Sequence, residues 1–275
     1  MSRLLSANFM RLRCSKVFWI CTAVMAGFAA VMQWFNYRDM GEGVDIVLES
    51  DLLVFVPLVG IVAAAFVGLF TGTEYSDGTI RNKVVIGHRR LDIYLSNLIT
   101  AAAAGAVMCA AYLALYSLIG VAVIGAFTTA LKEILIQILC VMVLSAALSA
   151  IFTLLAMNNQ NKAVSAVICM LLALGLLFAG SYVNGRLEEP EYMGGYYMDE
   201  SGTLREAEQE KNPRYLEGTE RKIYQFLYDF LPGGQQIQLG SGGAPQPWKL
   251  MGYSVIITVV TTAAGVLIFR KKDLR

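Results

Sequence analysis

Apolar residues along this chain form long runs that are separated by polar stretches. Six of the runs are long enough to cross a bilayer, because a helix needs about 20 apolar residues to span the hydrocarbon core. The pattern therefore predicts an all-α integral membrane protein with six transmembrane helices, at residues 17–34, 52–70, 95–127, 134–157, 163–183 and 251–269. The third run is longer than a bilayer requires, so we expect this helix to tilt or to begin before it enters the lipid.

The stretch before the first run is basic and amphipathic. Residues 1–16 contain no acidic residue, and Leu5, Phe9 and Leu12 fall at helical spacing on one side. These features predict an interfacial helix that lies on an anionic membrane face. The alternative is the start of a secretory signal. The length of the 17–34 run and the lack of a clear small-residue cleavage site disfavour it.

The polar loop between the second and third runs, residues 71–94, is expected to contain a short helix. Asp77 and Gly78 should end the preceding helix and cap the next one. That helix makes about two turns over 79–86, and Gly87 suits a left-handed C-cap. Because so short a helix is marginal in water, we expect it to dock on another surface.

Small residues recur every four positions along the second run. They are Gly60, Ala64, Gly68 and Gly72. Such a stripe lets another helix approach closely, either within the bundle or at a dimer seam, and we favour packing within the bundle. Pro57 is expected to kink the same helix near its outer end.

Residues 184–249 differ in character from the rest of the chain, since they contain eleven acidic and seven basic residues. Within them, 215–231 has Ile223, Phe226 and Phe230 on one helical face, together with Leu227. This periodicity predicts an amphipathic helix, and hence an ordered insertion rather than a linker.

The distribution of Lys and Arg predicts the orientation. Thirteen of them lie in the two termini, the 71–97 stretch and the 158–162 turn, whereas the short loops of the other side contain only Arg38 and Lys132. Positive charge marks the cytoplasmic side, and long loops cross the membrane largely regardless of charge. Both termini and the 71–94 loop are therefore predicted to be cytoplasmic, and the 184–249 insertion extracytoplasmic.

The composition agrees with a membrane protein, because only 16% of the residues are charged, against about 25% in soluble domains. The net charge of +1 gives no reason to expect a nucleic acid partner. The cysteines form no CxxC pair and are expected to be small packed residues rather than disulfides or metal ligands. They are Cys14, Cys21, Cys109, Cys140 and Cys169.

The sequence lacks the residues that several kinds of transport and catalysis require. The predicted spans contain essentially no Asp, Glu, Lys or Arg in their interiors, which argues against an ion-coupled carrier. The single histidine, His88, lies in a loop, and Ser145 and Ser149 are better explained by helix packing than by nucleophilic catalysis. No GxxxxGK[ST] run occurs, so we expect neither a catalytic site nor a nucleotide site in this chain.

The run 74–83, EYSDGTIRNK, is followed by Gly87, Arg90 and a long third helix. In this respect it resembles the cytoplasmic loop of type-2 ATP-binding-cassette (ABC) permeases. The ending FRKKD at 269–273 and the basic amphipathic start at 1–16 are similar to the C-terminal ending and the elbow helix of that family.

The resemblance implies a transmembrane subunit that pairs with a second, identical or homologous permease in the plasma membrane of a bacterium. It implies two cytoplasmic ATPase subunits, which would bind ATP and Mg²⁺, while this chain has no cofactor and contacts only protein and membrane lipid. The coupling helix would lie near 79–83. The residues expected to contact the ATPase are Glu74, Asp77, Gly78, Thr79, Ile80, Arg81, Lys83 and Arg90. Among them, Glu74, Arg81 and Lys83 have no evident opposing charge in their own chain.

In many exporters of this class a short re-entrant hairpin joins the fifth and sixth helices, and the larger 184–249 insertion departs from it. This departure leads us to expect a peptide, antimicrobial or lipid-like substrate that is met from outside. Two other functions stay open: an ATPase-independent carrier or channel, and a membrane sensor or scaffold that binds a ligand through the insertion.

Overall fold

The computed structural model describes residues 1–193, 196–198, 204–206 and 210–272, and these are largely helical. The helices are α1 (Ser2–Cys14), α2 (Lys16–Gly41), α3 (Val56–Ser76), α4 (Thr79–Val85), α5 (Arg90–Val123), α6 (Leu131–Asn158), α7 (Lys162–Glu188), α8 (Gly218–Phe230), α9 (Pro232–Gly240) and α10 (Pro247–Lys271). Six of them, α2, α3, α5, α6, α7 and α10, are long and apolar enough to cross a membrane. The predicted all-α membrane fold is confirmed.

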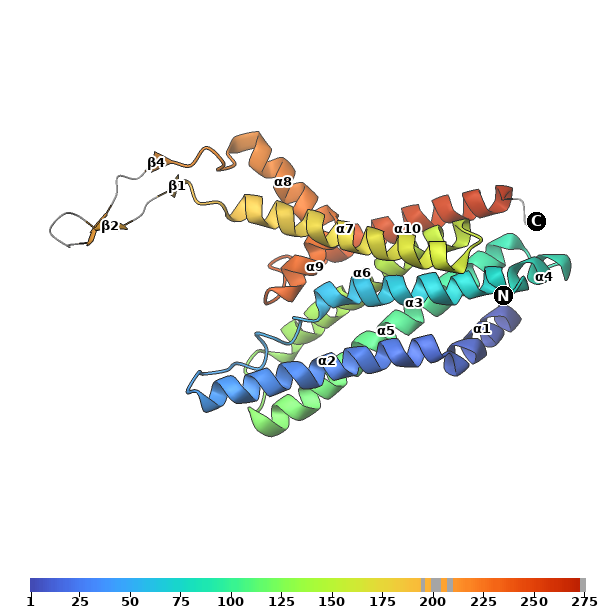
Figure 1. Ribbon diagram of the computed structural model, residues 1–275, viewed down its shortest axis with the longest axis horizontal. Coiled ribbons are helices and arrows are strands. Elements are labelled where there is room, and N and C mark those ends of the chain that lie inside the picture. Colours follow the sequence, from blue (N-terminus) through green and yellow to red (C-terminus); the bar gives the residue numbers. More distant parts are fainter. Residues whose placement is uncertain (194–195, 199–203, 207–209, 273–275) are drawn as a thin grey trace.

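The described strands are short and lie within the insertion. Strand β1 (Tyr192–Met193) pairs antiparallel with β4 (Glu210–Lys211), and β2 (Tyr196–Met198) pairs antiparallel with β3 (Leu204–Glu206). Figure 1 shows these strands and α8 at one end of the molecule, with both chain termini and α4 at the other. This arrangement follows from an even number of long helices.

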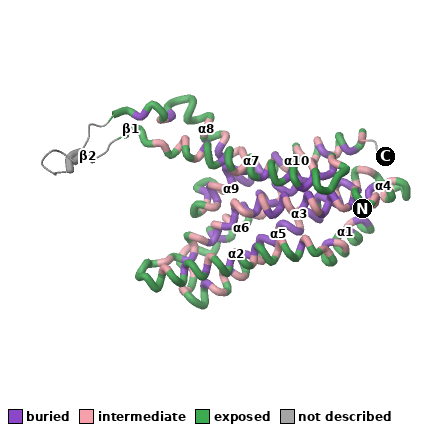
Figure 2. Tube along the Cα trace, viewed as in Figure 1, coloured by how far each residue is buried: buried purple, intermediate pink, exposed green. Residues whose placement is uncertain are grey.

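Helix α3 lies at the centre of the bundle and is the most buried of the six long helices. It packs against α7, α6 and α9, while α10 packs on α6 and α2 on α5. Figure 2 shows the buried residues concentrated inside the bundle and exposed residues along α2 and α7. Because the exposed side chains of these helices are mostly apolar, their outer faces suit lipid or another membrane protein.

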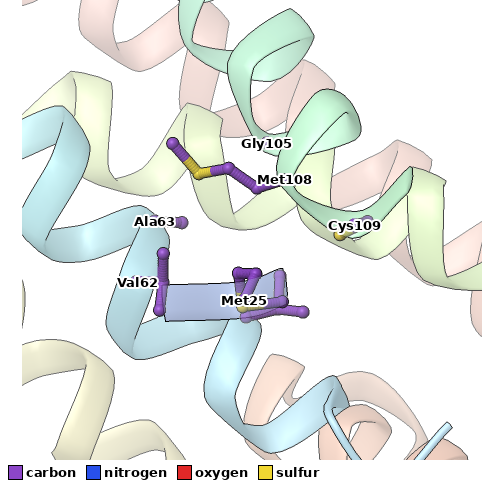
Figure 3. Close-up of a pocket in the computed structure, with 7 residues that line it drawn as sticks. Met25, Val62, Ala63, Gly105, Met108 and Cys109 are labelled. Atoms are coloured by element: carbon purple, nitrogen blue, oxygen red, sulfur yellow. The ribbon is translucent and has the colours of Figure 1, made fainter. Parts of the chain in front are cut away.

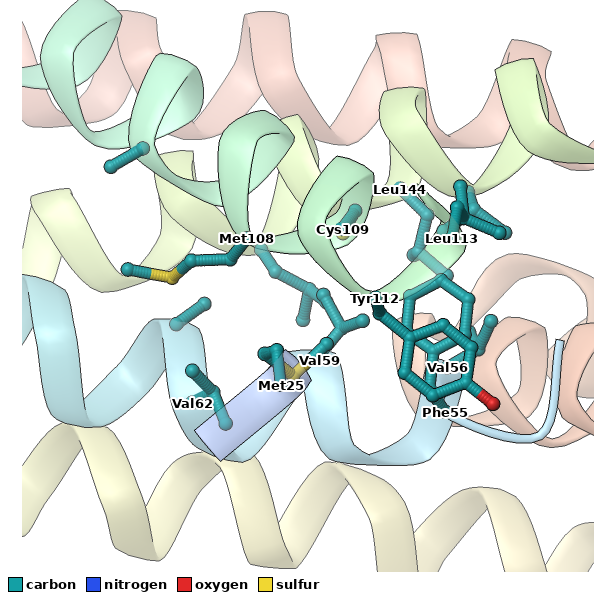
Figure 4. Packing of buried hydrophobic residues seen from close by; sticks show 14 of the residues in the cluster. Met25, Phe55, Val56, Val59, Val62, Met108, Cys109, Tyr112, Leu113 and Leu144 are labelled. Atoms are coloured by element: carbon teal, nitrogen blue, oxygen red, sulfur yellow. The ribbon is translucent and has the colours of Figure 1, made fainter. Parts of the chain in front are cut away.

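A row of stacked aromatic rings fills the core near the start of α3 (Figure 4). Phe55 stacks on Tyr112 with ring centroids 4.1 Å apart, and Tyr112 in turn stacks on Tyr116. Met25 and Val59 fill the space beside Tyr112. Aromatic pairs of this kind contribute about 0.5–1.5 kcal/mol beyond the area that they bury.

Helix α3 begins later than the apolar pattern predicts. Residues 48–55 form successive turns rather than helix, although Leu48, Leu52 and Phe55 are buried. Pro57 stands in the first turn of α3, where the missing amide hydrogen costs nothing. The expected kink at Pro57 is therefore wrong, because the residue starts the helix. Helix α5 begins at Arg90, before the apolar run that starts at 95, which agrees with the expected early start of this long helix.

Helix α1 packs on the bundle through a face that the apolar spacing did not indicate. Its buried residues are Leu4, Asn8 and Leu12, whereas Phe9 is exposed. The apolar spacing missed this face because its central residue is an amide. Asn8 donates a hydrogen bond to the side-chain oxygen of Asn97 at 2.8 Å, which satisfies the amide in the contact between α1 and α5.

The insertion contains a hairpin of two helices. Helix α8 lies within the predicted 215–231 segment, and α9 folds back onto the bundle against α7, α3 and α6. A Cβ added to Gly233 of α9 would lie 1.7 Å from the carbonyl oxygen of Leu176 in the middle of α7, so only glycine fits there. The large insertion therefore contains a pair of short helices, α8 and α9, one of which packs on the bundle.

Candidate functional site

Helix α4 is held at both ends by glycines in the left-handed conformation. Gly78 has φ of 69° and Gly87 has φ of 97°, a region that side chains with a Cβ rarely adopt. Ile80 is the buried residue of α4 and belongs to a cluster that includes Leu4 and Met157. This cluster supplies the docking surface that so short a helix needs.

The opposite face of α4 and the turn after it are exposed. Val85 is 78% exposed and Ile86 is 76% exposed, and Arg81 and Asn82 are exposed beside them. Figure 1 shows that α4 lies at the tip of the molecule, near both termini. Exposed aliphatic side chains beside an arginine form a surface suited to a protein partner.

Glu74, at the end of α3, is the centre of a buried ion network beneath α4. Its side chain is 1% exposed. The Arg11 Nη1 atom lies 2.6 Å from its Oε1, the Lys83 ammonium also contacts Oε1, and Asn97 donates to its Oε2 at 2.7 Å. A carboxylate can be buried here because both of its oxygens are paired with hydrogen-bonding partners.

Asn8 completes this network. Its side-chain oxygen accepts a hydrogen bond from Lys83 at 3.1 Å, while its amide group donates to Asn97. Arg11 also lies over the ring of Phe70, 3.7 Å from the ring centroid. The network therefore joins four elements: α1, the end of α3, α4 and the start of α5.

The network corrects the interpretation of Glu74 and Lys83. Both were expected to lack opposing charges in their own chain, and each has one. Glu74 and Lys83 lie nine residues apart and oppose each other, whereas the second cation on Glu74, Arg11, lies far away in the sequence. Arg81 differs, since it is exposed and no ion pair with it is found in the described part of the chain.

The other residues expected at the ATPase contact divide in the same way. Asp77 is exposed, whereas the Thr79 hydroxyl donates to the backbone oxygen of Glu74 at 2.9 Å. The Arg90 Nη1 atom donates to the backbone oxygens of Phe269 and Arg270, both at 3.0 Å, and also to that of Lys272. Arg90 therefore caps the C-terminus of α10, where a cation also complements the helix dipole.

Lys272 extends this tie to two further helices. Its ammonium donates to the backbone oxygen of Met157 at 3.0 Å and lies 3.3 Å from the Tyr75 hydroxyl. Burial lowers the pKa of Lys272 to about 8. The end of α10 is thus fixed to α3, α5 and α6. Asp273, the last residue of the FRKKD run, lies outside the described residues.

The small-residue stripe of α3 faces its neighbours inside the chain. A Cβ added to Gly68 would lie 2.7 Å from the Cα of Ala166 on α7, and one on Gly72 would lie 2.9 Å from the Cα of Lys162. At Gly60 the neighbour is the side chain of Gln236 on α9, and Ala64 is fully buried. The stripe thus brings α7 and α9 close to α3.

A small pocket lies between α2, α3 and α5 (Figure 3). Its volume is about 10 Å³, and its lining is apolar, with Met25, Val62, Ala63, Gly105 and Met108 among the residues around it. A space of this size holds at most one water molecule and no larger solute. It is a packing defect, and no substrate could occupy it.

Sequence reasoning missed Asn8 and Asn97 and did not connect Arg11 with Glu74. One signal was available, because Asn97 is an amide within a predicted membrane helix, and such a group needs a partner. The cysteine prediction was right for the three buried ones, Cys109, Cys140 and Cys169. It was wrong for Cys14, which is exposed.

The comparisons with known proteins agree with this architecture. A family model described as ABC-2 family transporter protein matches residues 4–175, more than half of the chain. No curated protein matches the chain. The match includes α1, the ion network, α4 and the first helices of the bundle. The chain therefore belongs to the ABC-2 family of transporter proteins, as a multi-pass permease subunit.

Proposed function

We propose that this permease is the membrane half of an ATP-driven exporter and that a separate cytoplasmic ATPase docks on α4. The observation that supports this most strongly is the contrast between the two faces of α4. Arg81, Val85 and Ile86 face outward, whereas Ile80 and Lys83 are held against the bundle. A helix exposed on one side and bound on the other can pass a displacement from a partner to the membrane helices.

The ion network would transmit this displacement from α4 to the membrane helices. Lys83 on α4 contacts Glu74 at the end of α3, and Glu74 in turn contacts Asn97 on α5. Separating Lys83 from Glu74 would remove one partner of a buried carboxylate, which costs about 1–3 kcal/mol. Movement of α4 should therefore move α3 and α5 together rather than break the contacts.

The energy source and the second permease belong to other chains in this proposal. ATP and Mg²⁺ would be bound by the ATPase subunits. We place the substrate path between two permease subunits, with the apolar outer faces of α2 and α7 as candidate surfaces. The termini and α4 would be cytoplasmic, and the chain would reside in the plasma membrane of a bacterium.

The substrate class follows from the insertion. On α8, Ile223 is 53% exposed and Phe226 is 49% exposed, at the end of the molecule opposite to α4 (Figure 1). An exposed apolar helix face at an outer membrane boundary suits an amphipathic molecule. We therefore propose a peptide, antimicrobial or lipid-like substrate.

The proposal is tested by purifying the permease with ABC ATPases encoded near it, and by reconstituting the complex in vesicles. ATP hydrolysis should rise when an amphipathic peptide or lipid-like substrate is added, and substrate movement should require ATP. Substrate movement without ATP would favour an ATPase-independent carrier. Ligand binding to the insertion without any movement would favour a sensor, and either result would overturn the proposal.

A further inference from the structure

An apolar groove lies between α5 and α10, on the surface of the bundle. Its volume is about 510 Å³, and Leu91 and Leu95 line it on one side and Val259, Ala263 and Val266 on the other. Val259 is 61% exposed, so the groove opens outward. Both helices are long and apolar enough to span a membrane, and the apolar lining of the groove suits a hydrocarbon chain.

A basic pocket continues the groove at the end of the two helices. Its volume is about 420 Å³, and it is lined by Arg89, Arg90, Leu91, Val266 and Arg270. Two of these residues, Leu91 and Val266, also line the groove. The two spaces are therefore continuous, apolar along the helices and basic at their ends.

The lining of the pocket is basic. Among the described residues, three arginines line it and no acidic residue does. The nearby Asp92 faces elsewhere, since its carboxylate lies 3.9 Å from the amino group of Met1. Arg90 is fixed by its hydrogen bonds to the end of α10, whereas Arg89 and Arg270 are exposed.

The wall behind the groove is rigid. The Tyr94 ring packs directly on Gly265, where an added Cβ would lie 2.1 Å from the Tyr94 hydroxyl oxygen. Tyr94 also packs against Phe269, with ring centroids 6.5 Å apart. These contacts and the Arg90 cap hold α5 and α10 at a fixed distance, so the site is formed before any ligand arrives.

We propose that the groove and the basic pocket together bind one anionic phospholipid. An acyl chain would lie against Leu95, Val259 and Ala263, and the phosphate would lie among Arg89, Arg90 and Arg270. The order of apolar and basic surface matches the order of chain and headgroup in a lipid. This inference requires only that the chain spans the membrane, and it does not depend on the proposed export function.

Anionic lipid fits the charges better than zwitterionic lipid does. A zwitterionic headgroup would bring its own cation into a pocket that already contains three, whereas phosphatidylglycerol brings a net negative charge. Each Lys or Arg near an anionic lipid contributes about 1 kcal/mol, so two of them change the affinity about thirtyfold. A free phosphate could use the pocket, but it would leave the groove empty.

The test measures lipid retention by the full-length protein in detergent, by native mass spectrometry with added phosphatidylglycerol or phosphatidylcholine. The double variant Arg89→Gln/Arg270→Gln should lose about thirtyfold in affinity for phosphatidylglycerol and change little toward phosphatidylcholine. Arg90 is left in place because it caps α10. The variant Ala263→Phe, which fills the groove, should weaken the binding of both lipids.

The matched control is Arg13→Gln/Lys16→Gln, which removes two exposed cations near the junction of α1 and α2. It should retain the bound phosphatidylglycerol. An equal loss in this control would show a general surface attraction and overturn the proposal. Displacement of the bound lipid by inorganic phosphate, or no effect of Ala263→Phe, would also overturn it. A melting temperature at the wild-type value shows that each variant is folded.

Discussion

The Arg11 guanidinium lies 2.6 Å from the Glu74 carboxylate, and this contact joins the first helix of the chain to the end of α3. Glu74 is 1% exposed, while Arg11 is 31% exposed. Both charges nevertheless depend on this contact, because the Nε and Nη2 atoms of Arg11 are buried and have no hydrogen-bond partner among the described residues. Helix α1 is thus tied to the end of α3 by a buried ion pair.

We predict that Glu74→Gln destabilises the protein by about 3 kcal/mol or more, because Arg11 and Lys83 would then face a neutral amide. Arg11→Gln should cost less, about 1–3 kcal/mol, because Lys83 and Asn97 still pair with Glu74. Reversible unfolding in detergent measures both free energies of unfolding.

The matched control for this pair is Arg38→Gln, which breaks an exposed pair with Asp39. Its effect should stay within about 1 kcal/mol, as is usual for surface ion pairs. If Glu74→Gln cost no more than the control, the network would not hold these elements together.

The close contact of α3 with α7 predicts that Gly68→Leu lowers the melting temperature in detergent. An added Cβ at Gly68 would lie 2.7 Å from the Cα of Ala166, so the two helices must separate and lose their packing contacts. Gly27→Leu on α2 is the control, because nothing lies within 4 Å of its added Cβ. Equal melting temperatures for the two variants would contradict the importance of this contact.

The hydrogen bonds of Glu49 predict that acid destabilises the loop that contains it, at the end opposite to α4. Burial raises the pKa of this carboxyl, but hydrogen bonds from the Thr128 side chain and from the backbone of Thr129 and Thr128 outweigh it and lower the pKa to about 2. Because the folded pKa lies below the usual 4.5, the stability contributed by Glu49 is fully present above pH 4.5. It is lost as the pH falls toward 2.

Thermal melting between pH 5 and pH 2 measures this loss. Wild-type protein should lose stability over this range, and Glu49→Gln should begin lower at neutral pH and lose less on acidification. Glu220→Gln, in the exposed first turn of α8, should behave like wild type. Identical pH profiles for Glu49→Gln and wild type would show that protonation of Glu49 does not weaken its contact with Thr128.

The orientation is tested by cysteine labelling in a variant whose five native cysteines are replaced by serine. Thr219→Cys, exposed on α8, should react with an impermeant thiol reagent in intact cells. Asn82→Cys on α4 should react only after lysis, because positive charge places this end in the cytoplasm. Ser201, in the middle of the insertion, lies outside the described residues. The opposite labelling would reverse the orientation.

The sequence was enough to predict the helices because bilayer length and apolarity fix them, as the match of α6 and α10 with predicted runs shows. The start of α3 was harder to predict, because Leu48 and Phe55 are as apolar as residues in a helix interior but lie in turns. The local rules also placed Gly78 and Gly87 correctly at the ends of α4. Both the apolar runs and the glycine caps depend on residues that are close together in the sequence.

The site depends on contacts that no local pattern contains. Glu74 was a charge in a predicted aqueous loop, and its burial follows from Arg11 and Asn97, which reach it from other helices. Likewise, the folding back of α9 depends on Gly233 meeting the backbone of Leu176. Arg81 was the exception, because its exposure required no distant partner.

The central claim is that an ABC ATPase docks on the exposed face of α4. We expect a photo-crosslinking residue at Val85 to crosslink to that ATPase in the assembled transporter, and one at Thr219 not to. Arg81→Glu should weaken the association about thirtyfold or more, because a hydrogen-bonded interface arginine contributes about 2–5 kcal/mol. Arg13→Glu, an exposed cation on α1, is the control and should have little effect.

The decisive measurement is the amount of ATPase that crosslinks to position 85 in wild-type and Arg81→Glu transporters with equal melting temperatures. The account predicts a strong crosslink in the wild type, its loss in Arg81→Glu, and a parallel loss of ATP-dependent transport. A transporter that moves substrate with ATP while position 85 crosslinks only to lipid, or whose crosslink and transport survive Arg81→Glu, would contradict it.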